Sequence, residues 1–416
     1  MRELRLAPAA VVAWLATLAV LFGQPWLFLA LVACFAFLRR APGQAILCTA
    51  SGALFATLAA VRMRRAEAFH FGSEVTGRHT ADPIQTASGW MVRLSVPGYP
   101  TQLPVFLTSQ PEAYAGSLVT IHGRPGFSDR VGVGQTVYSG ELTAHSHSWT
   151  AKVAENFRAI CDNGLIPGMV LGDTSLQRPE DKQLYIDTGL SHLSAVSGSN
   201  VAIVCTAAAL VVRGQKVRVG ASAGALALFV ALVGWEPSVQ RATVAGVAGL
   251  LAVLNSSTME ALHALSLGVL FLLAADSDLA VSFGFALSVA ATVGIVALTP
   301  LLLRVLGTGI IARAFAVAIA ADIVTMPLIA LMAGRVSVVS VIANVLAAPV
   351  VPIITVVGLI AAVLAQVGLG RPLVILIEPL ADWIHGVAAA MPLTTVEAGP
   401  FAVLLLVGWL IAALLR

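Results

Sequence analysis

The sequence has few charged residues, which make up 11% of its 416 positions, whereas hydrophobic residues make up 58%. A soluble globular domain usually carries about a quarter charged residues, so this composition excludes an ordinary soluble domain. Apolar runs recur along most of the chain, and each is near the length that crosses roughly 30 Å of hydrocarbon. We therefore expect a polytopic α-helical membrane protein.

Cysteine is also scarce, and no Cys-x-x-Cys or Cys/His spacing joins Cys34, Cys48, Cys161 and Cys205. Zinc sites and disulfide frameworks need such spacings, so we expect neither, nor any metal or cofactor. The net charge of +3 gives no indication of an acidic partner. The first apolar run lacks a small-residue cleavage site, and we interpret it as a retained helix.

The chain divides into four segments by composition. Residues 1–61 contain three apolar runs, near 7–22, 25–38 and 44–61. Residues 62–150 are polar, and their short alternating pieces, such as GWMVRLSV, are separated by Gly and Pro, which predicts a small antiparallel β domain shaped as a sandwich or barrel. Residues 151–188 form a connector that includes an amphipathic surface helix, and residues 189–416 contain about eight to nine membrane segments.

The distribution of Lys and Arg predicts how the chain is oriented. If the N-terminus is cytoplasmic, the β domain lies outside, and the second half places seven basic residues inside and two outside. Such a bias favours this topology for a multi-pass protein of the cytoplasmic membrane, although Arg62, Arg64 and Arg65 then fall outside. The seven are Arg213, Lys216, Arg218, Arg304, Arg313, Arg371 and Arg416, and the two are Arg241 and Arg335.

The stretch HLSAVSGSNV, residues 192–201, concentrates polar side chains at the start of an apolar run. Serine and asparagine there could bond across packed helices. The Ser-Gly-Ser-Asn tetrad could instead loosen the helix, and unwound backbone can line a pathway. A hydrolase built on His192 and Ser197 is a third alternative, but no G-x-S-x-G elbow and no clear acid accompany them.

Further polar residues interrupt the later apolar runs. Arg241 heads the run in WEPSVQRATVAG, where it could reach the head groups or face an aqueous path. Asp322 lies deep in AIAADIVTMPLIA, where an acid is costly, so we expect it to have a partner. Asn344 precedes Pro349 and Pro352, which predict a broken helix in the run 337–365.

The β domain combines basic and aromatic residues, a mixture that suits single-stranded nucleic acid because bases stack on rings and phosphates pair with cations. The aromatics could equally fill the core, with the arginines solvated. No carboxylate cluster accompanies His145 and His147, so no metal site is expected there. The mixture consists of Arg93, Arg124 and Arg130 with Trp90, Tyr99, Phe106 and Tyr138, and the candidate nucleic-acid contacts are Trp90, Arg93, Arg124 and Arg130.

Several of these stretches carry a resemblance to one family. GLSHLSAVSGSNVAIV resembles the signature of the ComEC/Rec2-type competence family. GLIPGMVLGDTS, GWEPSVQRATVAG, VSFGFALSVAATVGI and MPLIALMAGRVSVVSVIANVLAAPVVP resemble further family segments. Together these pieces span about 165–355.

The resemblance implies a channel that carries single-stranded DNA across the cytoplasmic membrane during natural transformation, with no enzyme activity of its own. It implies that the β domain is an extracytoplasmic OB-like domain. It also implies two partners, a DNA receptor at the outer face and a helicase-like translocase inside. On this basis we expect the DNA path to be lined by His192, Ser197, Ser199, Asn200, Arg241 and Asn344.

Two departures from the family pattern limit what the resemblance implies. Many members end in a metallo-β-lactamase-like domain, but this chain has no HxHxDH-type run, so we expect a short form without nuclease activity. Many members also have a histidine where this sequence has Asn200. The residues leave one further alternative, a small-molecule or ion transporter, which broken helices and Asp322 would fit.

Overall fold

The computed structural model divides the chain into two compact units. One unit contains residues 1–152, 234–245 and 258–282, and the other contains residues 153–233, 246–257 and 283–416. The structure describes residues 6–24, 42–72, 74–80, 83–86, 89–109, 111, 117–123, 125–128, 130–138, 141–146, 149–194, 196, 198–233, 239–240, 242–244, 246, 261–391 and 395–414.

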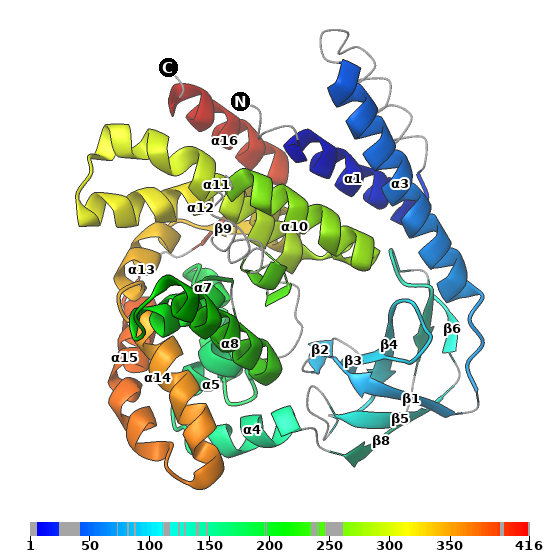
Figure 1. Ribbon diagram of the computed structural model, residues 1–416, viewed down its shortest axis with the longest axis horizontal. Coiled ribbons are helices and arrows are strands. Elements are labelled where there is room, and N and C mark those ends of the chain that lie inside the picture. The colour runs from blue at the N-terminus through cyan, green and yellow to red at the C-terminus, as the bar shows by residue number, and fades with distance from the viewer. Residues whose placement is uncertain are drawn as a thin grey trace. The chain divides into compact units, whose positions relative to one another are not determined.

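The first unit holds three apolar helices that pack on one another (Figure 1). They are α1 (Leu6–Leu21), α3 (Pro42–Glu67) and α10 (Ala261–Ala275), and α10 is followed by the short 3-10 helix η3 (Ser277–Val281). Small residues such as Ala9 are fully buried in α1, and small side chains allow membrane helices to approach closely. The predicted second apolar run, near 25–38, lies outside the described residues.

The β domain follows α3 and forms one mixed sheet, in the order β6-β7-β4-β3-β1-β5-β8 with β2 paired to β3. The prediction of a purely antiparallel domain is wrong, because β4 and β7 pair in parallel through Val105 and Val137. The chain reaches β7 by turning back from β6, which leaves β7 running alongside β4 in the same direction. The strands are β1 (Glu74–His79), β2 (Ile84–Thr86), β3 (Gly89–Ser95), β4 (Gln102–Leu107), β5 (Leu118–His122), β6 (Pro125–Phe127), β7 (Gln135–Val137) and β8 (Glu141–Ser146).

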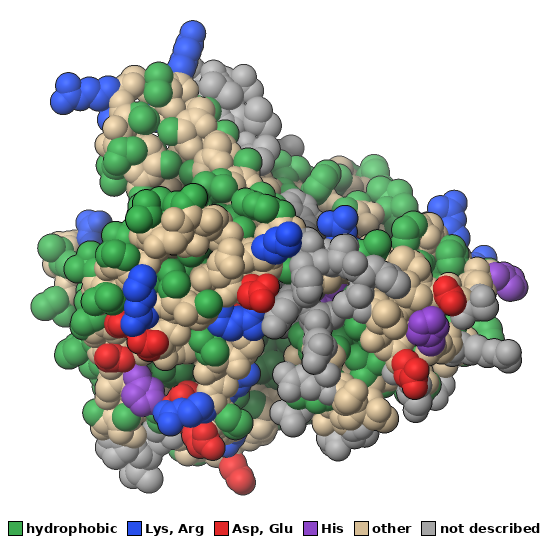
Figure 2. Space-filling model, turned by 90° about the horizontal axis from the view of Figure 1, so that it is seen from below, with side chains coloured by type: hydrophobic (Ala, Val, Ile, Leu, Met, Phe, Trp, Pro, Cys, Tyr) green, Lys and Arg blue, Asp and Glu red, His purple; other side chains and the backbone are tan. Residues whose placement is uncertain are grey.

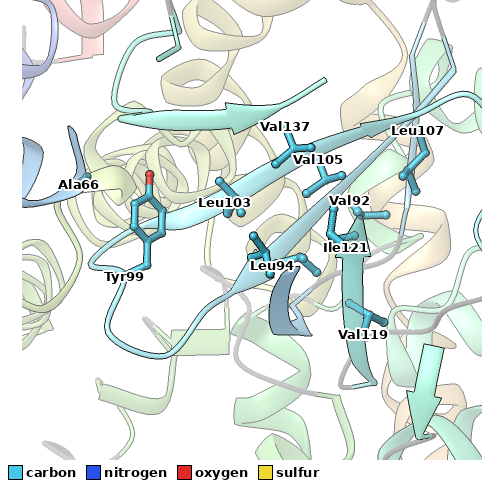
Figure 3. Close-up of a cluster of buried hydrophobic side chains, with 11 residues drawn as sticks. Ala66, Val92, Leu94, Tyr99, Leu103, Val105, Leu107, Val119, Ile121 and Val137 are labelled. Carbon is cyan, nitrogen blue, oxygen red and sulfur yellow. The ribbon is translucent and has the colours of Figure 1, made fainter. Parts of the chain in front are cut away.

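Alternate residues of these strands build a single core, because successive side chains of a strand point to opposite faces (Figure 3). Tyr99 belongs to this core, and its hydroxyl accepts a hydrogen bond from the Gln135 amide at 3.0 Å. The Gln135 side chain donates to the carbonyls of Ala66, Glu67 and Phe69 at the end of α3. One glutamine therefore satisfies the open carbonyls of a helix end and fixes the β domain to α3.

Residues of the connector form three short helices. α4 (Trp149–Arg158) is amphipathic, as predicted, but α5 (Leu165–Leu171) is buried along its whole length. α6 (Pro179–Asp187) follows the turn that Asp173 closes by accepting bonds from the Ser175 amide and hydroxyl. Asp173 also pairs with Arg158 of α4 at 3.2 Å, so its carboxylate holds the turn against α4.

The second unit contains most of the predicted membrane segments as separate helices (Figure 1). A two-stranded sheet of β9 (Arg335–Ser337) and β10 (Thr395–Glu397) joins two of their loops. The predicted segment near 239–254 lies mostly outside the described residues. The helices are α7 (Gly198–Leu210), α8 (Gln215–Val233), α11 (Phe283–Leu306), α12 (Ile310–Ala333), α13 (Ser340–Ala347), α14 (Val351–Leu364), α15 (Arg371–Ala389) and α16 (Pro400–Leu414).

Among the described residues, five helices are long and apolar enough to cross a membrane: α3, α8, α11, α12 and α15. The pair α13–α14 makes a sixth candidate, bent by 54° where Pro352 opens α14. This bend confirms the predicted broken helix. On the face drawn in Figure 2, hydrophobic side chains are exposed in many places, and charged side chains lie between them in small groups.

Candidate functional site

The polar stretch that begins at Gly189 is not part of a regular α-helix. Gly189 ends α6 in the left-handed region, with φ 73°, and the Leu190 amide then bonds to the Tyr185 carbonyl at 2.8 Å. A single 3-10 turn covers Ser191–Leu193, and α7 begins only at Gly198, inside the Ser-Gly-Ser-Asn tetrad. The irregular backbone therefore precedes the tetrad, and the prediction that the tetrad itself loosens the helix is wrong, because Gly198, Ser199 and Asn200 already belong to α7.

The side chains of this stretch divide into exposed and buried ones. His192 and Ser199 are exposed, whereas Asn200 is 4% exposed. The Asn200 amide donates to the Met169 carbonyl of α5 at 3.0 Å, which is a bond between helices rather than a contact open to a passing ligand. Ser197 and Arg241, both expected along the path, lie outside the described residues.

Asn344 of α13 lies against the start of the same stretch. Its side-chain nitrogen is 2.8 Å from the Ser340 carbonyl and 3.4 Å from the Gly189 carbonyl. A Cβ on Gly189 would come within 2.5 Å of the Ser340 Cβ, so only glycine fits against α13 here. The structure thus brings Asn344 to the polar stretch and adds Gly189 and Ser340 to the site.

Asp322 reaches this cluster from α12. Its carboxylate accepts a hydrogen bond from the Ser340 hydroxyl at 2.7 Å. The expectation that Asp322 has a partner is confirmed, and the partner is the first residue of α13. Four polar residues from three segments therefore meet around the start of α13: Gly189, Asp322, Ser340 and Asn344.

A second polar cluster lies between the connector and α15. Arg371, Glu378, Asp382 and His385 of α15 are separated by seven, four and three residues, which places them on one face of the helix. Arg371 donates to the Ile160 carbonyl and pairs with Asp162 at 2.6 Å.

The same face of α15 meets the connector again about three to four turns after Arg371. Asn163 donates to Asp382 at 2.7 Å, and the Tyr185 hydroxyl is 3.3 Å from His385 Nδ1. Hydrogen bonding to the exposed Arg178 lowers the pKa of Asp181, and burial raises the pKa of Tyr185 to about 12. The connector is therefore fixed along the polar face of α15.

The contacts leave a pocket of ≈ 290 Å³ between the connector and α15. The described residues include no group of three or more His, Cys, Asp or Glu that could hold a metal ion. The lining residues are Asp162, Asn163, Gly164, Leu165, Leu176, Gln177, Arg178, Asp181, Tyr185, Asp382 and His385.

The outer face of the β sheet gathers part of the predicted basic and aromatic set. Phe106 and Tyr138 stack with their ring centroids 5.5 Å apart, and the Arg130 guanidinium lies 4.4 Å from the Phe106 centroid. Arg93 projects from the same face of the sheet, two residues after Met91, the pairing partner of Phe106. Tyr138 is 59% exposed, so this surface, which we call the Phe106 platform, is open.

Other members of the predicted set lie elsewhere. Trp90 alternates with Met91 along β3 and packs against the buried core, and Tyr99 is part of that core. Arg124 lies outside the described residues, and nothing is described of the His145 side chain. Trp90 and Tyr99 therefore pack in the core of the β domain, whereas Phe106 and Tyr138 lie on its outer face.

Sequence reasoning missed two groups of residues. The spacing of Arg371, Glu378, Asp382 and His385 in an otherwise apolar run was a usable signal for the connector contact. Gly189 and Ser340 gave no such signal, because only the fold brings positions so far apart in the chain together.

The comparisons with known proteins give one match. The model of a family described as Competence protein matches residues 169–416, which include the polar stretch, Asp322, α13 and α15. No curated protein matches the chain, and no solved structure matches it.

Proposed function

The chain belongs to the competence protein family, since the family model covers more than half of it, and on that premise we propose that it carries single-stranded DNA across the cytoplasmic membrane during natural transformation. Two parts of the described structure would contact the DNA. They are the polar stretch at 189–200 and the Phe106 platform of the β domain.

The observation that carries the proposal is the unwound polar stretch within the matched region. His192 and Ser199 are exposed where α6 ends and α7 begins, next to helices long enough to span a bilayer. Backbone outside regular helix is tolerated at membrane depth only where protein or water covers it. We therefore assign 189–200 as the mouth of the channel, with His192 and Ser199 toward the DNA.

The buried residues of the mouth take a different role in this proposal. Asn200 bonds to α5 and Asn344 bonds to Gly189, so both hold the mouth in shape. Ser197 and Arg241 keep the roles that the sequence predicted, a contact along the path and a cation that attracts phosphates. No covalent step is proposed, and the protein acts as a channel rather than an enzyme.

The β domain would receive the strand before it enters the mouth. Stacked rings beside arginines bind single strands of any sequence, because every base has a flat face and every nucleotide a phosphate. The meander β1-β3-β4 together with the parallel pair β4–β7 supports an OB-like fold. The Lys/Arg distribution supports placing this domain outside the cell, where a DNA receptor would hand over the strand, and a helicase-like translocase would pull it inside.

A small-molecule or ion transporter remains the second candidate, and the bent pair α13–α14 beside Asp322 favours it. Broken helices and an intramembrane acid are features that many transporters share. The two candidates differ in cargo, so the decisive readout is DNA rather than growth or viability.

The test is uptake of labelled DNA into transformable cells in which this gene is the only copy of its kind. Deletion should abolish DNase-protected internal DNA and leave surface-bound DNA in place. His192→Leu should reduce internal DNA at unchanged protein level, and Glu397→Gln, an exposed acid in β10, serves as the control. Normal uptake in the deleted strain would overturn the proposal and favour another cargo.

A further inference from the structure

Asp322 is an acid placed near the middle of an apolar helix. It lies 12 residues after Ile310 and 11 before Ala333, the two ends of α12, so about 18 Å of helix precedes it. Its one described hydrogen bond comes from the Ser340 hydroxyl. An ionised carboxylate away from water is stabilised by the donors that reach it, so the Ser340 bond matters most when Asp322 is ionised.

No basic side chain offsets this carboxylate among the residues that the structure describes. The elements packed on α12 are α11, α13, α16 and β9. α13 and α16 contain no charged residue, α11 contains only Arg304, near its end, and α12 itself has Arg313 in its first turn. Arg335 of β9 pairs with Asp187 at 3.3 Å, and no described residue forms a salt bridge with Asp322.

Ser340 connects this carboxyl to the mouth. It is the first residue of α13, it is 5% exposed, and its Cβ occupies the space in which any side chain at Gly189 would have to fit. Asn344, one turn later, bonds to the carbonyls of both Ser340 and Gly189. A continuous set of contacts therefore runs from Asp322 through Ser340 to Gly189, the residue from which the mouth begins.

We propose that Asp322 is a proton-binding residue that controls the mouth through Ser340. The ionised carboxylate accepts a charge-assisted bond, which is roughly twice as strong as the bond that a neutral carboxyl accepts. The ionised form holds α13 on α12 and Gly189 on α13. When Asp322 takes up a proton from the water at the mouth, that bond weakens and residues 189–200 loosen. This inference rests on the proposed function only in taking DNA as the cargo that passes the mouth. Proton binding by Asp322 does not depend on that proposal.

A proton is the ligand that this geometry favours. The site offers one carboxyl and one hydroxyl, and the described residues include no cluster of His, Cys, Asp or Glu that could hold a metal ion. A lone acid with one hydroxyl partner can change its protonation without needing a second ligand.

The test is hydrogen exchange of the purified full-length protein in lipid nanodiscs at pH 5.5 and pH 8, corrected for the intrinsic pH dependence of exchange. Backbone amides of 189–200 should exchange several-fold faster at pH 5.5 in the wild-type protein. Asp322→Asn should exchange at the faster rate at both pH values, because its side chain is neutral throughout. Glu397→Gln is the matched control and should behave as the wild type does.

Ser340→Ala removes the hydroxyl but keeps the Asp322 carboxyl and a small side chain at position 340. It therefore separates the effect of the Ser340–Asp322 hydrogen bond from the effect of the acid itself. It should also lose the pH dependence at 189–200, and it remains informative even if Asp322→Asn does not fold. Equal exchange at both pH values in the wild type, or a pH dependence that survives in Ser340→Ala, would overturn the inference. No DNA is present in this experiment, so its result is independent of the uptake test. Failure of the uptake test would overturn only the proposal that the cargo is DNA.

Discussion

At the scale of single residues, the site depends on contacts between positions that are distant in sequence. His192, Ser199, Asn200 and Asn344 could be chosen from the sequence because polar side chains are rare in apolar runs. Their division into exposed and buried ones could not be predicted, because it depends on where α7 begins and on the position of α5. Gly189 gave no signal, since glycines are frequent in this chain.

Gly189→Ala is expected to disrupt the mouth. A left-handed φ costs a non-glycine residue about 1–2 kcal/mol, and the added Cβ would overlap the Ser340 Cβ, whose distance from it would be 2.5 Å. We expect faster hydrogen exchange in 189–200 and loss of DNA uptake. Gly368→Ala is the matched control, because it has φ 75° but nothing within 4 Å of its Cβ. Equal effects of the two variants would contradict a specific contact at Gly189.

A second prediction concerns pH and the first unit. Arg62 of α3 pairs with Asp276 and Asp278 at 2.5 and 3.2 Å, and it also donates to the Pro100 carbonyl. Burial raises the pKa of Asp278 to about 7. The positive charge of Arg62 lowers this pKa, and the negative charge of Asp276 raises it. Between about pH 4 and 7 the native state therefore binds more protons at this site than the unfolded state.

The contribution of Asp278 to the free energy of unfolding should consequently fall as pH rises from about 4 to 7 and stay level above pH 7. Hydrogen exchange of residues 276–282 should become faster over that interval once intrinsic rates are removed. Asp278→Asn should remove the pH dependence. A wild-type profile that is flat between pH 4 and 7 would contradict the protonated state assigned to Asp278.

At the scale of elements, sequence patterns predicted most helices and the position of the broken one. Long apolar runs and prolines act locally, so α11, α12 and the bend between α13 and α14 follow from them. The parallel pair β4–β7 and the burial of α5 were not predicted, because each depends on contacts with other elements. α3 also continues beyond its apolar part to Glu67, with Arg64 and Arg65 in its last turn.

The contact between the connector and α15 is open to a direct test. Arg371 is 38% exposed and bonds to Ile160, Asp162 and Glu378, so Arg371→Met should remove three contacts and loosen residues 159–164. Arg178→Ala is the control, because Arg178 is 71% exposed and pairs with Asp181 three residues on, and such exposed pairs contribute little to stability. Limited proteolysis within the connector reports the difference. Cleavage that is no faster in Arg371→Met than in Arg178→Ala would show that the contact is weak.

At the scale of the whole molecule, the chain belongs to the competence protein family, and the path of single-stranded DNA through it is our proposal. Composition alone predicts a membrane protein, and the quoted stretches from 165 to 355 point to the family that the comparison then matches over 169–416. Composition could not predict the division into two units. The first unit contains both the β domain and α10, a helix more than a hundred residues later in the chain, and such a grouping is not a local property of sequence.

The central claim, that single-stranded DNA passes the mouth at 189–200, is tested most directly by crosslinking during uptake. A photoreactive amino acid at the exposed Ser199 should crosslink to labelled DNA only in cells that are taking DNA up. The same group at Leu405 of α16, 76% exposed on an apolar helix, should give no crosslink. Crosslinks at Leu405 as strong as those at Ser199, or none at Ser199 while internal DNA accumulates, would contradict the path proposed for the strand.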